Sequence, residues 1–206
     1  MTTPRLVICN GIVVDPTSAT VEARDLLIES GRIAEIAPPG QIQVPDAERY
    51  DASNRLITPA FVNAHTHGHS NLVKGVADRW TLEASLTNGP WLAGARDTET
   101  IYLSALLGAL DMLSKGCTSC FDLVYEFPLP TRAGFAAVAR AYADAGMKAV
   151  LAPMVADKTL FTAIPGLLDS LPDDLRKTVS QFDLGSADAT IAAIEEIAAS
   201  RDELPE

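Results

Sequence analysis

The sequence lacks three features, and each absence excludes a class of protein. No apolar run reaches the roughly 18 residues that a membrane-spanning helix needs, so no membrane partner is predicted. Residues 1–5 do not form a charged segment followed by an apolar core, so no secretory signal is predicted and a cytoplasmic location is expected. Positive charge is also scarce, because 16 Lys and Arg stand against 27 Asp and Glu, and the net charge of −11 argues against nucleic acid as a partner.

Cysteine is rare as well, and three cysteines in a chain of this size do not make a disulfide framework. Cys117 and Cys120 have the C-x-x-C spacing of zinc and redox sites. However, no second pair accompanies them, and they lie inside an apolar strand pattern, where residues three apart face opposite sides of the sheet. We therefore expect buried small side chains here rather than a metal or redox site.

The first quarter of the chain differs from the rest. Within residues 5–52, short apolar runs are separated by turn signals at Asn10-Gly11, Asp15-Pro16 and Ser30-Gly31, a pattern typical of an antiparallel β unit. This pattern predicts a small N-terminal β domain over residues 1–55, which needs another domain to pack against because so short a chain buries little surface.

From residue 56 onward, strands alternate with helices. Apolar strands are expected over 56–64, 117–124 and 147–155, and helices over 101–114 (opening at residues 97–100), 131–145 and 188–200. Such alternation is typical of parallel βαβ units, so residues 56–206 are predicted to be α/β. The pattern gives roughly three βα units, and because a complete (β/α)8 barrel takes about 250 residues, a barrel cannot close within residues 56–206.

All three histidines of the chain lie in the segment 65–69. Residues two apart on a strand point to the same face, so His65 and His67 can reach one metal ion from the C-terminal end of a strand. An isolated H-x-H also occurs in surface loops without any function. Here the apolar strand before the pair favours a metal site formed by His65 and His67.

Residues 56–67, Leu-Ile-Thr-Pro-Ala-Phe-Val-Asn-Ala-His-Thr-His, resemble the signature of the amidohydrolase superfamily, although Ala60 replaces the usual glycine. Residues 71–75, 109–122 and 145–151 are similar to segments of the branch that contains adenosine-type, cytosine and guanine deaminases and triazine chlorohydrolases. Asp111 stands where glutamate is commoner in that branch. The resemblance covers nearly the whole chain.

The resemblance implies a partial (β/α)8 TIM barrel preceded by a small β-sandwich-like domain, of which residues 1–55 are one half. It also implies one divalent metal, zinc or iron, held by His65 and His67 together with a histidine and an aspartate from later strands. Such a metal lowers the pKa of a bound water, which then attacks a carbon of a small-molecule heterocyclic substrate and releases ammonia or another group.

No histidine follows His69, so the resemblance places the other metal ligands and every proton-transferring residue beyond Glu206. No catalytic residue is therefore expected within the chain. His69, Trp80 and Asp122 are candidates for the substrate loop. Each also has a structural alternative: loop packing for His69, core filling for Trp80 and bonding to loop amides for Asp122.

Three interpretations remain open at this stage. The chain is the N-terminal portion of a hydrolase acting on non-peptide C–N bonds, most readily a heterocycle deaminase; or a truncated or split chain with no catalysis of its own; or part of a binuclear hydrolase of cyclic amides, similar to dihydroorotase or imidazolonase. The complete protein is expected to be a homo-oligomer, unless a second chain supplies the missing half of the barrel.

Overall fold

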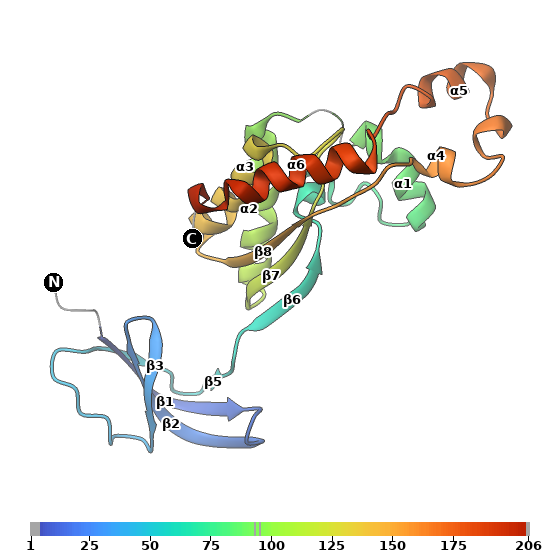
Figure 1. The fold of residues 1–206 in the computed structure, drawn as a ribbon. Coiled ribbons are helices and arrows are strands. Elements are labelled where there is room, and N and C mark those ends of the chain that lie inside the picture. The colour runs from blue at the N-terminus through green and yellow to red at the C-terminus, as the bar shows by residue number, and fades with distance from the viewer. Residues whose placement is uncertain (1–4, 93, 95, 205–206) are drawn as a thin grey trace. The chain divides into compact units, whose positions relative to one another are not determined.

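The structure is a computed structural model that describes residues 5–92, 94 and 96–204, and it is of the α/β class (Figure 1). It divides into two compact units, the first ending at Ala60 and the second beginning at Phe61. Within the described residues, none of the helices combines the length and the apolar character required to span a membrane.

The first unit is a five-stranded sheet in the order β3-β2-β1-β4, with β5 paired to β1. Strands β1, β2 and β3 are antiparallel, whereas β4 and β5 run parallel to β1, so the sheet is mixed rather than purely antiparallel as predicted. The strands span β1 Arg5–Asp15, β2 Thr20–Glu29, β3 Arg32–Ala37, β4 Glu48–Asp51 and β5 Leu56–Ile57.

Two of the predicted turns in this unit are present, and the third is not. Chain reversals follow Asp15 and occur at Ser30-Gly31, where both residues have positive φ (53° and 71°). The turn expected at Asn10-Gly11 is instead a bulge inside β1, with Asn10 at φ 63°. Strand β1 continues through the bulge without reversing. The Asn10 N–H donates to the buried Asp25 carboxylate at 3.0 Å, a contact that fixes the bulge within the sheet.

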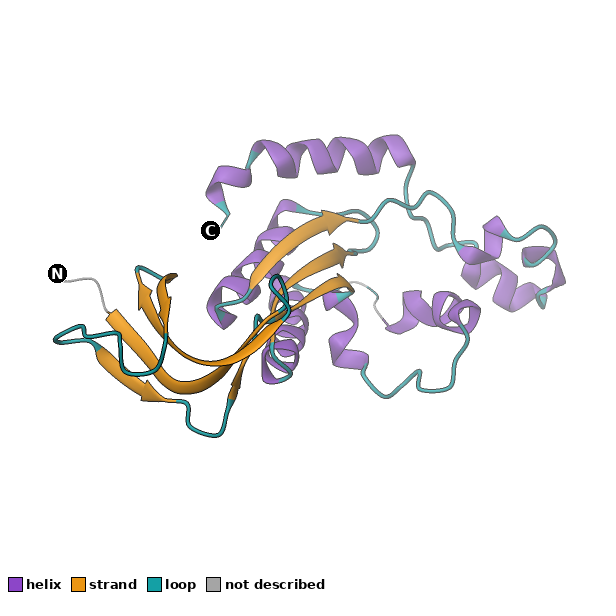
Figure 2. Ribbon diagram, turned by 90° about the horizontal axis from the view of Figure 1, so that it is seen from below, coloured by secondary structure: helices purple, strands orange, loops and turns teal. Residues whose placement is uncertain are grey.

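The second unit contains a three-stranded parallel sheet in the order β6-β7-β8, formed by β6 Phe61–Thr66, β7 Cys117–Val124 and β8 Lys148–Pro153. Helix α2 packs against β7, α3 against β8 and against α2, and α6 against α3 (Figure 2). The α-helices span α1 Leu82–Leu92, α2 Thr98–Ser114, α3 Arg132–Ala145, α4 Leu160–Ala163, α5 Asp173–Val179 and α6 Ala187–Ala199. Short 3-10 helices span η1 Gly68–Val73, η2 Leu168–Ser170 and η3 Arg201–Glu203.

Local capping explains why the main helices begin and end where the sequence predicts. The Asp97 carboxylate accepts a hydrogen bond from Thr100 N at 2.7 Å and opens α2. The Thr131 hydroxyl accepts one from Gly134 N at 3.0 Å and opens α3, which ends at Gly146 in the left-handed conformation. The predicted helices and the strand over 117–124 are confirmed by α2, α3, α6 and β7.

The predicted single strand over 56–64 is wrong, because the structure has two strands there. Leu56 and Ile57 pair with β1, whereas the residues from Phe61 onward pair with β7. The break at 58–60 contains Pro59, which has no N–H to donate to a sheet. The two units consequently divide after Ala60.

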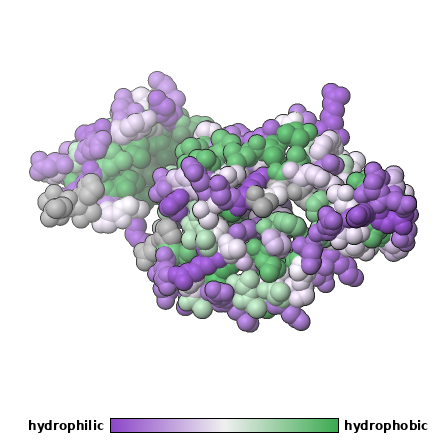
Figure 3. Space-filling view, turned by 90° about the horizontal axis from the view of Figure 1, so that it is seen from above, coloured by the Kyte–Doolittle hydropathy of each residue, from purple (hydrophilic) through white to green (hydrophobic). Residues whose placement is uncertain are grey.

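The core of the second unit lies between the sheet and its helices. Cys120 is buried and Cys117 half-buried, and both are free thiols. Large apolar side chains stay exposed on the two outer strands, with Phe61 at 65% and Val62 at 69% on β6 and Val150 at 59% on β8. Figure 3 shows hydrophobic residues gathered on one face of the molecule among hydrophilic ones. The buried core residues are Ala105, Ala109, Met112, Cys120, Val124, Phe135, Val138, Ala141, Tyr142, Met147 and Ile197.

Candidate metal centre

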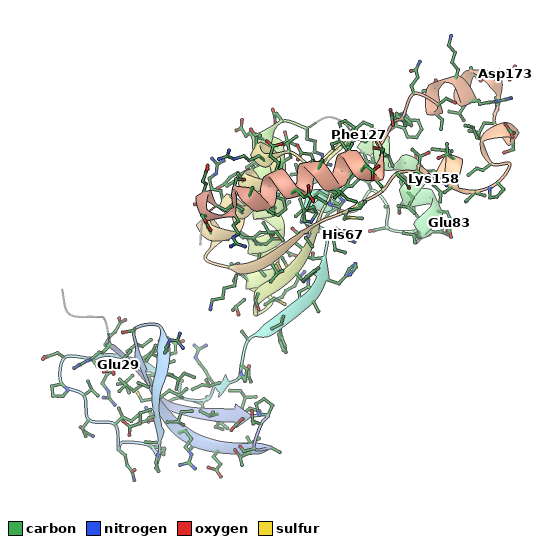
Figure 4. All side chains as sticks on the ribbon, viewed as in Figure 1. Glu29, His67, Glu83, Phe127, Lys158 and Asp173 are labelled. Atoms are coloured by element: carbon green, nitrogen blue, oxygen red, sulfur yellow. The ribbon has the colours of Figure 1, made fainter. Side chains whose placement is uncertain are left out.

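The paired histidines lie at the C-terminal edge of the parallel sheet. His65 is in β6, and His67 follows the strand directly, before η1 (Figure 4). Because residues two apart on a strand share a face, the two imidazoles meet, with their Nε2 atoms 3.2 Å apart and their ring centroids 4.9 Å apart.

This separation fits two ligands of one cation. In a tetrahedral zinc site with Zn–N bonds of about 2.0–2.1 Å, neighbouring nitrogens are about 3.3–3.4 Å apart. The donor atoms are also suitable, because neutral imidazole nitrogens bind zinc and iron. Within the described residues, no group of three or more His, Cys, Asp or Glu could hold a metal ion.

The segment after His67 is held by hydrogen bonds from several elements. The Gly68 N–H donates to Oδ1 of Asp122 at 2.8 Å, and the Gly68 carbonyl accepts from the Ser104 hydroxyl at 2.8 Å. The Asn71 side chain also donates to this carbonyl, at 3.0 Å. The backbone next to the histidine pair is thus tied to β7 and to α2.

Asp122 is fully buried in β7. Its Oδ2 accepts a hydrogen bond from the Tyr142 hydroxyl at 2.8 Å. Burial raises the pKa of Asp122, although the hydrogen bonds from Gly68 and Tyr142 oppose that shift. Burial also raises the pKa of Tyr142, and the neighbouring carboxylate raises it further. The structural alternative, a carboxylate bonded to a loop amide, describes this residue.

His69 is directed into the protein. Its ring packs 5.5 Å from the ring of His67 and 5.5 Å from that of Tyr125. Burial lowers the pKa of His69 to about 4, so the ring is neutral at neutral pH. Its carbonyl accepts a hydrogen bond from the Arg96 guanidinium, and the two residues help to line a small pocket with Tyr125 and Glu126.

The two tryptophans lie in different settings. Trp80 is 38% exposed and lies in the loop that precedes α1. Trp91, in α1, makes edge-on contacts with Phe161 and Phe182, with centroids 6.5 and 4.8 Å apart. The structure therefore brings His65, His67, His69 and Asp122 into one region, and gives Trp80 no ring contact with the histidines within the described residues.

Sequence reasoning missed Ser104 and Tyr142. Both lie inside helices far along the chain from their partners, 36 residues from Gly68 and 20 residues from Asp122 respectively. No short motif marks a serine or tyrosine in the middle of a helix. The glycine after His67 was the one local sign that the backbone approaches another group closely at this point.

Comparison with known proteins identifies the family. The amidohydrolase family profile matches residues 56–204. A 5-methylthioadenosine/S-adenosylhomocysteine deaminase of Symbiobacterium thermophilum is 38% identical over 152 residues, which are 72% of this chain and 33% of that protein. A 5'-deoxyadenosine deaminase of Methanocaldococcus jannaschii is 34% identical over 130 residues, which are 63% of this chain and 29% of that protein.

Solved structures share the fold. An atrazine chlorohydrolase from Arthrobacter aurescens, complexed with zinc, superposes with a TM-score of 0.66 at 21% identity. The match covers 74% of this chain and 36% of the chlorohydrolase chain. An amidohydrolase from a Sargasso Sea environmental sample superposes with a TM-score of 0.64 at 23% identity. That match covers 95% of this chain and 42% of the amidohydrolase chain. The chain spans about a third of the length of the curated relatives that it matches. Since the family profile matches most of its residues, the chain belongs to the amidohydrolase family.

Proposed function

We propose that this chain is the N-terminal part of a metal-dependent amidohydrolase that hydrolyses a non-peptide C–N bond, by deamination of a heterocycle. The observation that carries the proposal is the pair of Nε2 atoms, 3.2 Å apart at the C-terminal edge of the parallel sheet. The curated relatives support adenosine-type deamination, and a 5'-modified adenosine is the substrate class that we propose.

The proposed fold is a small β-sandwich-like domain followed by the first three βα units of a (β/α)8 barrel. The mixed sheet of the first unit and the β6-β7-β8 sheet support this division. The exposed apolar side chains of β6 and β8 support a larger structure that covers them. Further residues of the same protein, or a second chain, supply the rest of the barrel in this proposal.

His65 and His67 are the proposed ligands of one divalent metal, zinc or iron. Both would bind through Nε2, which the 3.2 Å separation of these atoms allows. A divalent ion bound there supplies the acidity that lets water act as a nucleophile near neutral pH. His65 and His67 would hold this ion at the open edge of the sheet, where active sites of barrel enzymes lie. The remaining ligands and the proton-transferring groups belong to later strands.

The test is release of ammonia by the natural full-length protein. Adenosine, 5'-deoxyadenosine, 5'-methylthioadenosine and S-adenosylhomocysteine are supplied in turn, and cytosine, guanine and a chlorinated triazine serve as comparisons. The expected result is ammonia from an adenosine-type substrate, lost on chelation and restored by zinc or iron. Activity that survives complete removal of metal would contradict the proposal.

A further inference from the structure

We propose that Asp122 is a positioning residue of the metal centre: it fixes the peptide group that follows His67 and so directs the His67 imidazole. The inference rests on the proposed function, in which His67 is a metal ligand. Asp122 acts from the interior, through the backbone, and does not touch the metal or the substrate.

The peptide group between His67 and Gly68 makes hydrogen bonds through both its carbonyl oxygen and its N–H. Its carbonyl oxygen accepts hydrogen bonds from the N–H of Ser70 at 3.1 Å and from the Ser70 hydroxyl at 2.9 Å. Its N–H donates to Oδ1 of Asp122 at 2.8 Å. The Asp122 bond connects this peptide to the neighbouring strand β7, just beyond Thr66, the last residue of β6 that pairs with β7.

The His67 ring has no comparable support of its own. Its Nδ1 atom is buried and has no hydrogen-bond partner within the described residues. Metal-binding histidines usually donate the second ring N–H to a carboxylate or a carbonyl, which orients the ring. For His67, orientation therefore depends on its backbone and on packing against the rings of His65 and His69.

Both carboxylate oxygens of Asp122 accept hydrogen bonds. Oδ1 accepts from Gly68 N, and Oδ2 accepts from the Tyr142 hydroxyl, which keeps the carboxylate pointing at the loop. The side chain has no exposed surface. A carboxylate so enclosed is placed to hold the loop and not to coordinate an ion at the open edge of the sheet.

The residue at position 68 must be small for the same reason. A Cβ atom there would lie 2.4 Å from Oδ2 of Asp122 and 3.2 Å from the Tyr142 hydroxyl oxygen. A methyl group therefore cannot be added without pushing the carboxylate aside. This close approach offers a second way to break the contact, one that removes no polar group.

The experiment measures the dissociation constant of zinc for the metal-free natural full-length protein, by competition with a chelating dye. Loss of a group that orients a metal ligand typically weakens metal binding by about 10- to 100-fold, which is the effect expected for Asp122→Ala. Asp122→Asn keeps an acceptor oxygen for the Gly68 N–H, so it is expected to bind zinc nearly as tightly as the parent.

Two glycine variants provide a second test of the contact in case Asp122→Ala does not fold. Gly68→Ala is expected to weaken zinc binding because it displaces the carboxylate. Its matched control is Gly89→Ala in α1, where an added Cβ has nothing within 4 Å. Gly89→Ala is expected to leave zinc binding unchanged.

Parent-like zinc binding by Asp122→Ala or by Gly68→Ala would overturn the inference. Equal weakening by Asp122→Asn and Asp122→Ala would also overturn it, since charge and not the hydrogen bond would then be responsible. A parent protein that binds neither zinc nor iron, or a His67→Ala variant that binds zinc as tightly as the parent, would overturn the proposed function and this inference together. The failure of one is therefore distinguishable from the failure of both.

Discussion

The hydroxyl of Tyr142 is expected to stabilise the fold because it satisfies a buried charge. Tyr142 is 2% exposed and Asp122 is 0% exposed, and the hydrogen bond between them is 2.8 Å long. A hydrogen bond to a charged group contributes about 1.5–3 kcal/mol, and phenylalanine fills nearly the same space. Tyr142→Phe is therefore expected to lower the free energy of unfolding by about 2 kcal/mol at neutral pH.

The loss is expected to depend on pH in a definite direction. Burial already raises the pKa of Asp122 above its ordinary value of 3.8, and the Tyr142 hydrogen bond opposes that rise. Without the hydroxyl the pKa rises further. A carboxyl with a raised pKa contributes stability that is present below its unfolded pKa and is lost as the pH rises through its folded pKa. Tyr142→Phe should therefore destabilise the protein more near pH 7 than near pH 4.

The measurement is urea unfolding followed by tryptophan fluorescence, with the transition midpoints compared at a common slope. Tyr102→Phe is the matched control, because the Tyr102 hydroxyl also donates to a carboxylate, that of Asp144 at 2.9 Å, but in an exposed pair. Exposed polar pairs contribute little, so this control should hardly move the midpoint. Equal midpoint shifts in the two variants would refute the reasoning.

Three further changes test the packing and the helix ends. Ser186→Ala removes the side chain that accepts a hydrogen bond from Ala189 N at 3.1 Å at the start of α6, and it should cost about 1 kcal/mol in urea unfolding; no change would mean that the cap is not formed. Phe135→Ala opens a cavity at a side chain that is 7% exposed, and a loss of about 3–5 kcal/mol is expected; a loss below about 1 kcal/mol would place Phe135 outside the core. Gly146→Ala forces a Cβ into the left-handed region at φ 71° and should cost about 1–2 kcal/mol, whereas a stabilised variant would contradict the C-cap of α3.

The elements that the sequence predicted well carry their signals locally. Asp97 and Thr131 lie within three residues of the amides that they cap, and Gly146 ends α3 by its own backbone conformation. The two-residue spacing of His65 and His67 likewise predicts that their rings lie close together, because residues two apart on a strand point to the same face. Such features need no knowledge of the rest of the fold.

The features that the sequence did not predict depend on partners far along the chain. The bulge at Asn10 is fixed by Asp25, which lies 15 residues away. The strand expected over 56–64 is divided because its two parts find partners in different sheets. The buried bond between Asp122 and Gly68 joins residues 54 apart, which only the pairing of β6 with β7 brings together.

The measurement that tests the metal centre most directly is the metal content of the natural full-length protein and of its His65→Ala and His67→Ala variants, each purified without chelators. The expected result is one equivalent of zinc or iron in the parent and loss of that metal in both variants, because each would keep only one of the two paired imidazoles. Full metal occupancy in His67→Ala would contradict the assignment of this pair as metal ligands.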